Sequence, residues 1–141
     1  MTKYTFGAES AKRLATCDQK LQKIAQRALS YGVMDFSILE GIRSLEKQQE
    51  EFRAGRSQID GVTKLSMHQH NPSRAFDLLP FPAVVNGVNV WDDKQRFAVL
   101  AGLICAAAAE EGISIRWGGD WDGDGNNADS KLHDMPHFEL A

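Results

Sequence analysis

Hydrophobic residues recur at helical spacing in three parts of the chain. Between residues 8 and 30, apolar side chains return every three or four positions with Lys, Arg and Gln between them, which predicts one amphipathic helix. A shorter helix is predicted over residues 45–53, with Ser44 as its N-cap and Gly55 just past its end. A third helix is predicted over residues 93–110.

The third predicted helix is more apolar than the other two. Asp92 and Gln95 resemble a capping box at its start, and Gly112 is placed to end it. Its apolar run, residues 97–109, is shorter than the ~20 residues that cross a bilayer. We therefore expect a buried helix and no membrane insertion.

Alternating or β-branched stretches predict the strands of a small sheet, at residues 35–40, 74–79, 113–117 and 137–140. Asn86-Gly87, between β-branched residues, is typical of a tight hairpin turn. No repeat or linker interrupts this order of helices and strands. The pattern predicts a single α+β domain over residues 1–141, with helices packed on a small antiparallel sheet.

The composition is that of an ordinary globular protein, with 43% hydrophobic and 25% charged residues. The net charge of −3 argues against binding to a nucleic-acid backbone, which depends on clustered Lys and Arg. Cys17 and Cys105 lie in apolar stretches without a CxxC pattern, so we expect buried, free thiols. The N-terminal residues lack the features of a signal peptide, which predicts that the protein begins in the cytoplasm.

All four histidines lie in two short windows. His68 and His70 precede a predicted strand that contains Asp77, an acidic residue among apolar neighbours, and His133 and His137 lie near the C-terminus. Two imidazoles and one carboxylate, with a fourth position for water, form a ligand set of catalytic zinc. From spacing alone, metal binding and ordinary structural roles stay equally open.

Three stretches resemble the signature of a family of zinc peptidases that cut cell-wall peptides: Ser66-x-His68, residues 72–77, and Asp134-x-x-His137. The family includes D-Ala-D-Ala carboxypeptidases, vancomycin-resistance dipeptidases and phage L-alanyl-D-glutamate endopeptidases, and is related to the hedgehog fold. The resemblance implies a hedgehog/DD-peptidase-like fold and is closest to the phage endolysins.

Two further segments carry the same resemblance. Residues 41–44, followed by Gln48, look like the family's Gly-x-Arg-Ser/Thr segment before a Gln-bearing helix. Residues 116–121 look like the strand and loop ahead of the last ligand. The order and spacing match from about residue 36 to the C-terminus.

The resemblance implies a role for each matched residue. His68, Asp77 and His137 would be the zinc ligands. Asp134 would be the catalytic carboxylate that takes a proton from the attacking water and passes it to the leaving amine. Arg43 would bind a substrate carboxylate or the developing oxyanion.

One departure from the family pattern leaves a choice of ligand. His68 and Asp77 are nine positions apart, two more than in the family's common short form, and the shorter spacing reaches His70 instead. We expect His68, because Ser66 stands two positions before it as in the family. Ser66 and Trp117 are further candidates for substrate binding, although Trp117 fits packing at the sheet edge equally well.

The residue type at position 134 bears on the substrate. In the family, Asp before x-x-His is typical of L-Ala-D-Glu endopeptidases, whereas carboxypeptidases and dipeptidases carry Glu. Asp134 therefore favours an endopeptidase acting on the stem peptide of bacterial peptidoglycan. A D,D-carboxypeptidase or dipeptidase and a catalytically silent metal-binding module are the alternatives. A phage lysis enzyme of this type is made in the host cytoplasm and released to the wall by a holin, and we expect a monomer.

A glycine- and aspartate-rich loop offers a candidate calcium site. Asp120, Asp122 and Asp124 place carboxylates at alternate positions, as in the first half of an EF-hand loop. Lys131 stands where that loop has its bidentate Glu, so the motif is incomplete. The sequence leaves open a regulatory Ca²⁺ site and a solvated acidic loop.

Overall fold

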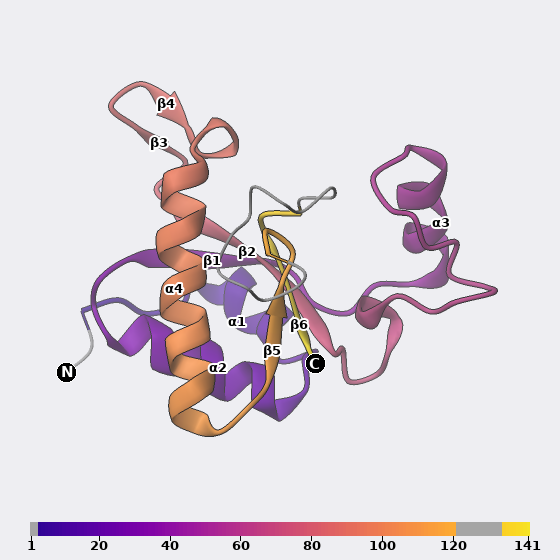
Figure 1. Cartoon of the computed structure of the whole chain (residues 1–141), viewed down its shortest axis with the longest axis horizontal. Helices are drawn as coiled ribbons and strands as arrows, with labels where there is room; N and C mark the ends of the chain where they lie inside the picture. Colours follow the sequence, from indigo (N-terminus) through magenta and orange to yellow (C-terminus); the bar gives the residue numbers. More distant parts are fainter. Residues whose placement is uncertain (1–2, 121–133) are drawn as a thin grey trace.

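A four-stranded antiparallel sheet forms the centre of the computed structural model, which describes residues 3–120 and 134–141. Its strand order is β1-β2-β6-β5. The strands are β1 (Asp35–Glu40), β2 (Ala75–Phe81), β5 (Ile115–Trp117) and β6 (His137–Leu140). A separate hairpin of β3 (Val84–Val85) and β4 (Val88–Asn89) projects beyond the end of β2 (Figure 1). The predicted α+β class is confirmed.

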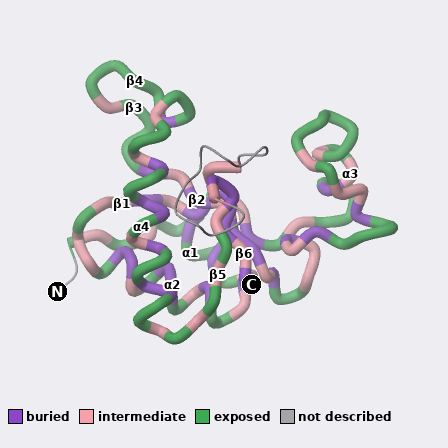
Figure 2. The backbone as a smooth tube through the Cα atoms, in the orientation of Figure 1, coloured by how far each residue is buried: buried purple, intermediate pink, exposed green. Residues whose placement is uncertain are grey.

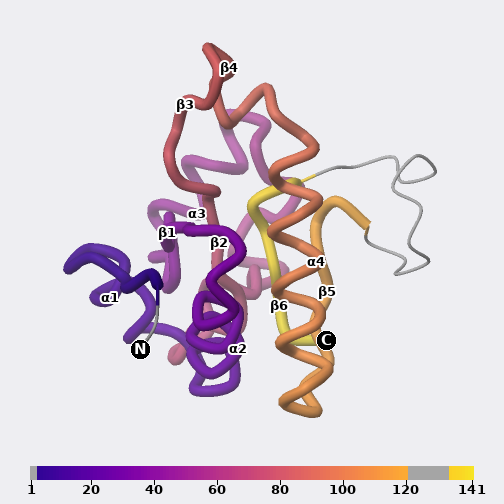
Figure 3. Tube along the Cα trace, turned by 90° about the vertical axis from the view of Figure 1, so that its left-hand side faces the viewer, coloured from indigo at the N-terminus to yellow at the C-terminus, as the bar shows by residue number. Residues whose placement is uncertain are grey.

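Most of the helices pack on the sheet or on one another. The helices are α1 (Ala8–Leu14), α2 (Gln19–Ser30), α3 (Leu45–Arg53) and α4 (Lys94–Glu111), with the short 3₁₀ helices η1 (Met67–Gln69) and η2 (Val90–Asp92). α2 packs against α4, and α1 packs against β1. α4 runs alongside β5 and β6 (Figure 3), whereas α3 lies apart from the other helices (Figure 1). No helix in the described part of the chain is long and apolar enough to cross a bilayer.

The buried core lies between the sheet and the pair of helices α2 and α4 (Figure 2). Ile24 of α2 and Ile104 of α4 are fully buried, as are Phe76 of β2 and Phe138 of β6. The two phenylalanine rings meet edge to face, with centroids 6.2 Å apart. Burying a side chain of this size contributes roughly 1.5–3 kcal/mol. This packing holds β2 against β6 in the register that places Asp77 opposite His137.

The predicted single helix over residues 8–30 is wrong, because the structure breaks it into α1 and α2. At the break, Cys17 forms a bridge with Ser73, and the Asp18 N–H donates to the Ser73 carbonyl (2.8 Å). The Asp18 side chain then caps α2 by accepting from the Lys20 N–H (2.9 Å). Pairing with a residue far along the chain therefore interrupts a pattern that is locally continuous.

Other local predictions fare differently. α3 has the predicted bounds, and Ser44 caps it as expected by accepting from the Lys47 N–H. The N-cap of α4 is Asp93 and not Asp92, because Asp93 accepts from the Arg96 N–H (3.2 Å). Both cysteines are free thiols as predicted, one of them buried. Cys105, expected to be buried, is exposed on α4.

Candidate metal centre and active site

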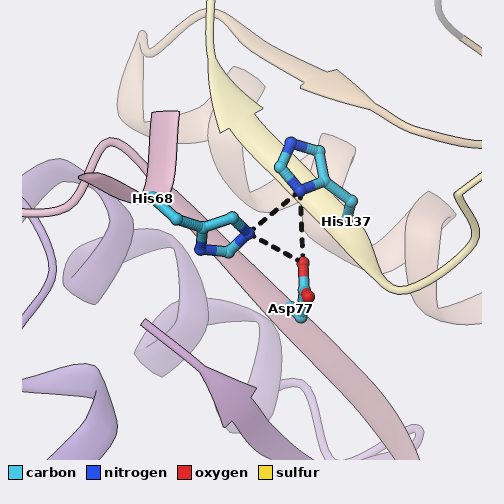
Figure 4. A group of neighbouring side chains, drawn as sticks. All are labelled: His68, Asp77 and His137. Atoms are coloured by element: carbon cyan, nitrogen blue, oxygen red, sulfur yellow. Dashed lines mark hydrogen bonds and ion pairs between the residues drawn. The ribbon is translucent and has the colours of Figure 1, made fainter. Parts of the chain in front are cut away.

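Three side chains from separate parts of the chain converge at the β2–β6 pair (Figure 4). Asp77 and His137 are register partners on these strands, and η1 brings His68 to them. His68 Nε2 lies 3.1 Å from Asp77 Oδ1 and 3.2 Å from His137 Nδ1, and His137 Nδ1 lies 3.2 Å from the same carboxylate oxygen. His68 is almost fully buried.

The outer nitrogen of each imidazole has an acceptor that sets the ring's tautomer. His68 Nδ1 lies 2.8 Å from the carbonyl of Gly41, so this nitrogen carries the hydrogen and Nε2 keeps its lone pair. His137 Nε2 lies 2.8 Å from Glu139 Oε1, which leaves the lone pair on Nδ1. In the neutral rings, two lone pairs and a carboxylate oxygen therefore face one another, an arrangement that a cation between them would stabilise. Histidines that bind a metal commonly donate their other ring N–H to a carboxylate or a backbone carbonyl in this way.

The dimensions of the cluster fit a zinc ion. Ligand atoms bound at about 2.0–2.1 Å with tetrahedral angles lie about 3.3 Å apart. The three distances among His68, Asp77 and His137 are 3.1 to 3.2 Å. Two imidazole nitrogens and one carboxylate oxygen are also ligands that zinc prefers. The residues present therefore fit this metal.

Without a metal, the same site holds a proton. Burial lowers the pKa of His137, but hydrogen bonds with Asp77 and Glu139 outweigh it and raise the pKa to about 9. Burial raises the pKa of Asp77, whereas hydrogen bonds with His137 and His68 bring it well below its usual range. The hydrogen bond from His137 likewise lowers the pKa of Glu139, against the effect of burial.

The structure brings His68, and not His70, into the cluster. Within the described residues, the group of side chains that could hold a metal ion consists of His68, Asp77 and His137. His70 follows η1 in extended conformation. Ser66 is buried at the start of η1, and its N–H donates to Oε1 of the residue that ends this helix, Gln69 (2.8 Å). Ser66 thus helps to shape the segment that carries His68.

Arg43 lies at the edge of this cluster. Its Nη2 is 3.8 Å from Asp77 Oδ2, and its backbone N–H donates to the carbonyl of His68 (2.8 Å). Its guanidinium pairs with Glu40 through Nε and donates from Nη1 to Gln48 Oε1 (2.8 Å). These contacts hold a nearly buried cation beside the predicted ligands.

Gln48 and Glu40 were not predicted as site residues. Gln48 is fully buried, and its Nε2 donates to Ser57 Oγ (2.9 Å) and to the carbonyl of Ile59 (2.6 Å). It therefore joins the Arg43 side chain to the loop after α3. Gln48 was part of the family resemblance, but its hydrogen bond with Arg43 and the pairing of Arg43 with Glu40 emerge only in the folded chain.

Asp134 lies beside the cluster on the turn that leads into β6. Its N–H donates to the carbonyl of Gly118 (2.8 Å), and its carbonyl accepts from the His137 N–H (3.1 Å). Burial and the negative charge of Asp77 raise the pKa of Asp134, partly offset by nearby positive groups. A raised pKa suits a carboxylate that accepts and returns a proton near neutral pH.

Two predicted features lie at the margin of the described structure. Trp117 is partly buried, and its indole N–H donates to the carbonyl of Met135 (2.7 Å). Of the candidate calcium residues, Asp120 is described, and its N–H donates to the carbonyl of Trp117 (3.1 Å). Asp122 and Asp124 lie outside the described residues, as does His133.

Comparison with known proteins identifies the family of this chain. The sequence profile of the phage L-alanyl-D-glutamate peptidase family matches residues 2–141. The L-alanyl-D-glutamate peptidase of Escherichia phage T5 is 33% identical, over 98% of this chain and 98% of that protein. The crystal structure of the Serratia marcescens L-Ala D-Glu endopeptidase ChiX matches with a TM-score of 0.75 and 34% identity, covering 96% of this chain and 89% of the other. The resemblance inferred from the sequence is confirmed, and the chain belongs to the phage L-alanyl-D-glutamate peptidase family.

Proposed function

We propose that this chain is a zinc-dependent endopeptidase that hydrolyses the L-Ala–D-Glu bond of the peptidoglycan stem peptide. The observation that carries the proposal is the placement of Asp134, a carboxylate of raised pKa, beside three convergent ligand atoms. Membership of the peptidase family supports the same bond and substrate. A silent metal-binding module needs no carboxylate in that position.

The residues divide the chemistry between them. His68, Asp77 and His137 would hold the zinc, which supplies Lewis acidity and lowers the pKa of a water molecule toward about 7. Asp134 accepts a proton from the water molecule while the oxygen of that water bonds to the peptide carbonyl carbon. Asp134 then returns the proton to the amine of D-Glu as the carbon–nitrogen bond breaks.

Arg43 would bind negative charge on the substrate. Its guanidinium is held by Glu40 and Gln48, so its position is set before substrate arrives. A fixed cation beside the cluster suits a stem-peptide carboxylate or the oxyanion that develops during attack. Ser66 and Trp117 are the other residues for which we propose substrate contacts or support of the site.

The test is digestion of purified Gram-negative peptidoglycan by the zinc-loaded protein, with the fragments identified by mass spectrometry. We expect new amino termini on D-Glu and L-Ala left on the glycan. Release of terminal D-Ala would instead establish a D,D-carboxypeptidase. Asp134→Asn should retain zinc and lose activity by on the order of 10²–10⁴-fold. Asp92→Asn, at an exposed position in η2, is the matched control.

The oligomeric state of the enzyme, its location in the cell and its binding of Ca²⁺ also belong to the proposal. We propose a monomer that is made in the host cytoplasm, reaches the wall after holin action and binds neither nucleic acid nor membrane. Binding of Ca²⁺ by Asp120, Asp122 and Asp124 stays a prediction. Calorimetry that detects no heat with millimolar Ca²⁺ would remove it.

A further inference from the structure

The turn that carries Asp134 is held from two sides. From the β5 end, Gly118 accepts from the Asp134 N–H and donates to the carbonyl of His137, each at 2.8 Å. From β2, the Leu78 N–H donates to the carbonyl of Pro136 (2.8 Å). Backbone partners thus cover the start and the end of the turn.

The middle of the turn is bound by a side chain. The Trp117 indole N–H donates to the carbonyl of Met135, one residue after Asp134, at 2.7 Å. The indole stacks on Phe138, with ring centroids 6.4 Å apart and an interplanar angle of 17°. A Cβ at Gly119 would lie 2.4 Å from this ring, so the backbone there passes directly against the indole. These contacts fix the direction of the N–H.

The backbone after β5 can approach this turn only because residue 118 is a glycine, which has no side chain. A Cβ at Gly118 would lie 2.1 Å from the carbonyl oxygen of Asp134 and 2.9 Å from its Cβ. Any larger residue at Gly118 therefore has to push Asp134 away. The close approach of Gly118, the residue after β5, therefore limits where the Asp134 backbone and Cβ can lie.

We propose that Trp117 is a positioning residue for Asp134, acting through the Met135 carbonyl and not by contact with substrate. The inference rests on the proposed function, because it assigns Asp134 the proton transfer. The indole nitrogen has one hydrogen to donate, and the turn already uses it. Without that bond the Met135 carbonyl loses the side-chain donor that ties the turn to β5, and the carboxylate loses its defined distance from the attacking water.

The first test is Trp117→Phe, which keeps a ring to stack on Phe138 and removes the N–H. Peptide-bond hydrolysis is measured on a soluble muropeptide, and zinc content by elemental analysis. We expect about tenfold lower kcat, comparable to the loss of one hydrogen bond, with unchanged KM and one zinc per chain. Trp91→Phe, at an exposed indole in η2, is the matched control and should retain full activity.

A double-mutant cycle then tests whether Trp117 acts through Asp134. In an Asp134→Asn background, measured with long incubations, Trp117→Phe should reduce the residual rate no further. Gly118→Ala perturbs the same carboxylate from its backbone. It should lower kcat more than Trp117→Phe does, again with zinc retained.

Each other outcome overturns the inference. A rise in KM at constant kcat would identify Trp117 as a substrate contact. An additive effect with Asp134→Asn would show that it acts independently of this carboxylate, and loss of zinc or of the fold would make it a general structural residue. Unchanged kcat in Trp117→Phe refutes this inference alone, whereas absence of cleavage by the unmodified chain refutes the proposed function as well.

Discussion

Replacing Glu139 by alanine is expected to weaken zinc binding while all three predicted ligands stay in place. Glu139 Oε1 lies 2.8 Å from Nε2 of His137, and its side chain is 14% exposed. This contact selects the tautomer whose Nδ1 lone pair points into the cluster. Its loss frees the other tautomer, lets the ring turn and removes a negative charge next to the metal.

The expected size of the effect follows from the position of this contact directly behind a ligand. Partners of this kind typically change metal affinity by about 10–100-fold, or about 1.4–2.7 kcal/mol. Glu139→Gln should fall between the unmodified chain and Glu139→Ala, because an amide oxygen can accept the same hydrogen bond without the charge.

The assay is competition for zinc with a chromogenic chelator, which yields the Kd of each variant. Glu46→Ala, at an exposed acidic position on α3, is the matched control and should leave the Kd unchanged. Circular dichroism of the zinc-free proteins checks that the sheet is intact. An unchanged Kd in Glu139→Ala would refute the assignment of the His137 tautomer and of the metal-facing nitrogen.

Three further predictions concern the ligands, the pH dependence and the core. His68→Ala should abolish stoichiometric zinc binding while His70→Ala leaves most of it, and elemental analysis showing the reverse would move the ligand to His70. The folded-state pKa of His137 is raised from 6.5 to about 9 in the zinc-free protein, so its contribution to stability is complete below pH 6.5 and is lost as the pH rises through about 9. Urea unfolding of the zinc-free protein should therefore show declining stability over this range, with a smaller decline when zinc occupies the lone pair; parallel curves would contradict this reasoning. Ile104→Ala removes a fully buried side chain between α4 and the sheet and should cost about 2–5 kcal/mol by the same measurement, whereas a cost below about 1 kcal/mol would mean that the core refills the space.

The sequence predicted those helices and turns whose capping or turn residues lie within a few positions of the element. α3 begins after Ser44 and is followed by Gly55, whose φ of +77° is the left-handed conformation that glycine favours. The hairpin turns at Asn86 and Gly87, both with positive φ as a tight turn requires. Caps and turns depend on contacts over two to four residues, so the neighbouring sequence is enough to predict them.

The candidate ligands could also be predicted from the sequence, because the family motif specifies residue types in a fixed order along the chain. His68, Asp77, Asp134 and His137 match the family signature, and the structure places the first, second and fourth together. A motif lists no partners. Glu40, which pairs with Arg43, follows no pattern that a single sequence can display.

Tertiary structure decided where distant segments meet. The helical pattern of residues 8–30 continues through Cys17, and only its pairing with Ser73, far along the chain, divides it. The choice of His68 over His70 for the cluster also depends on packing, because η1 directs one imidazole toward β2 while the Gly41 carbonyl holds its outer nitrogen. Sequence by itself determined the local elements and the candidate chemistry, whereas the geometry that makes three side chains a single site came from long-range contacts, which local periodicity does not encode.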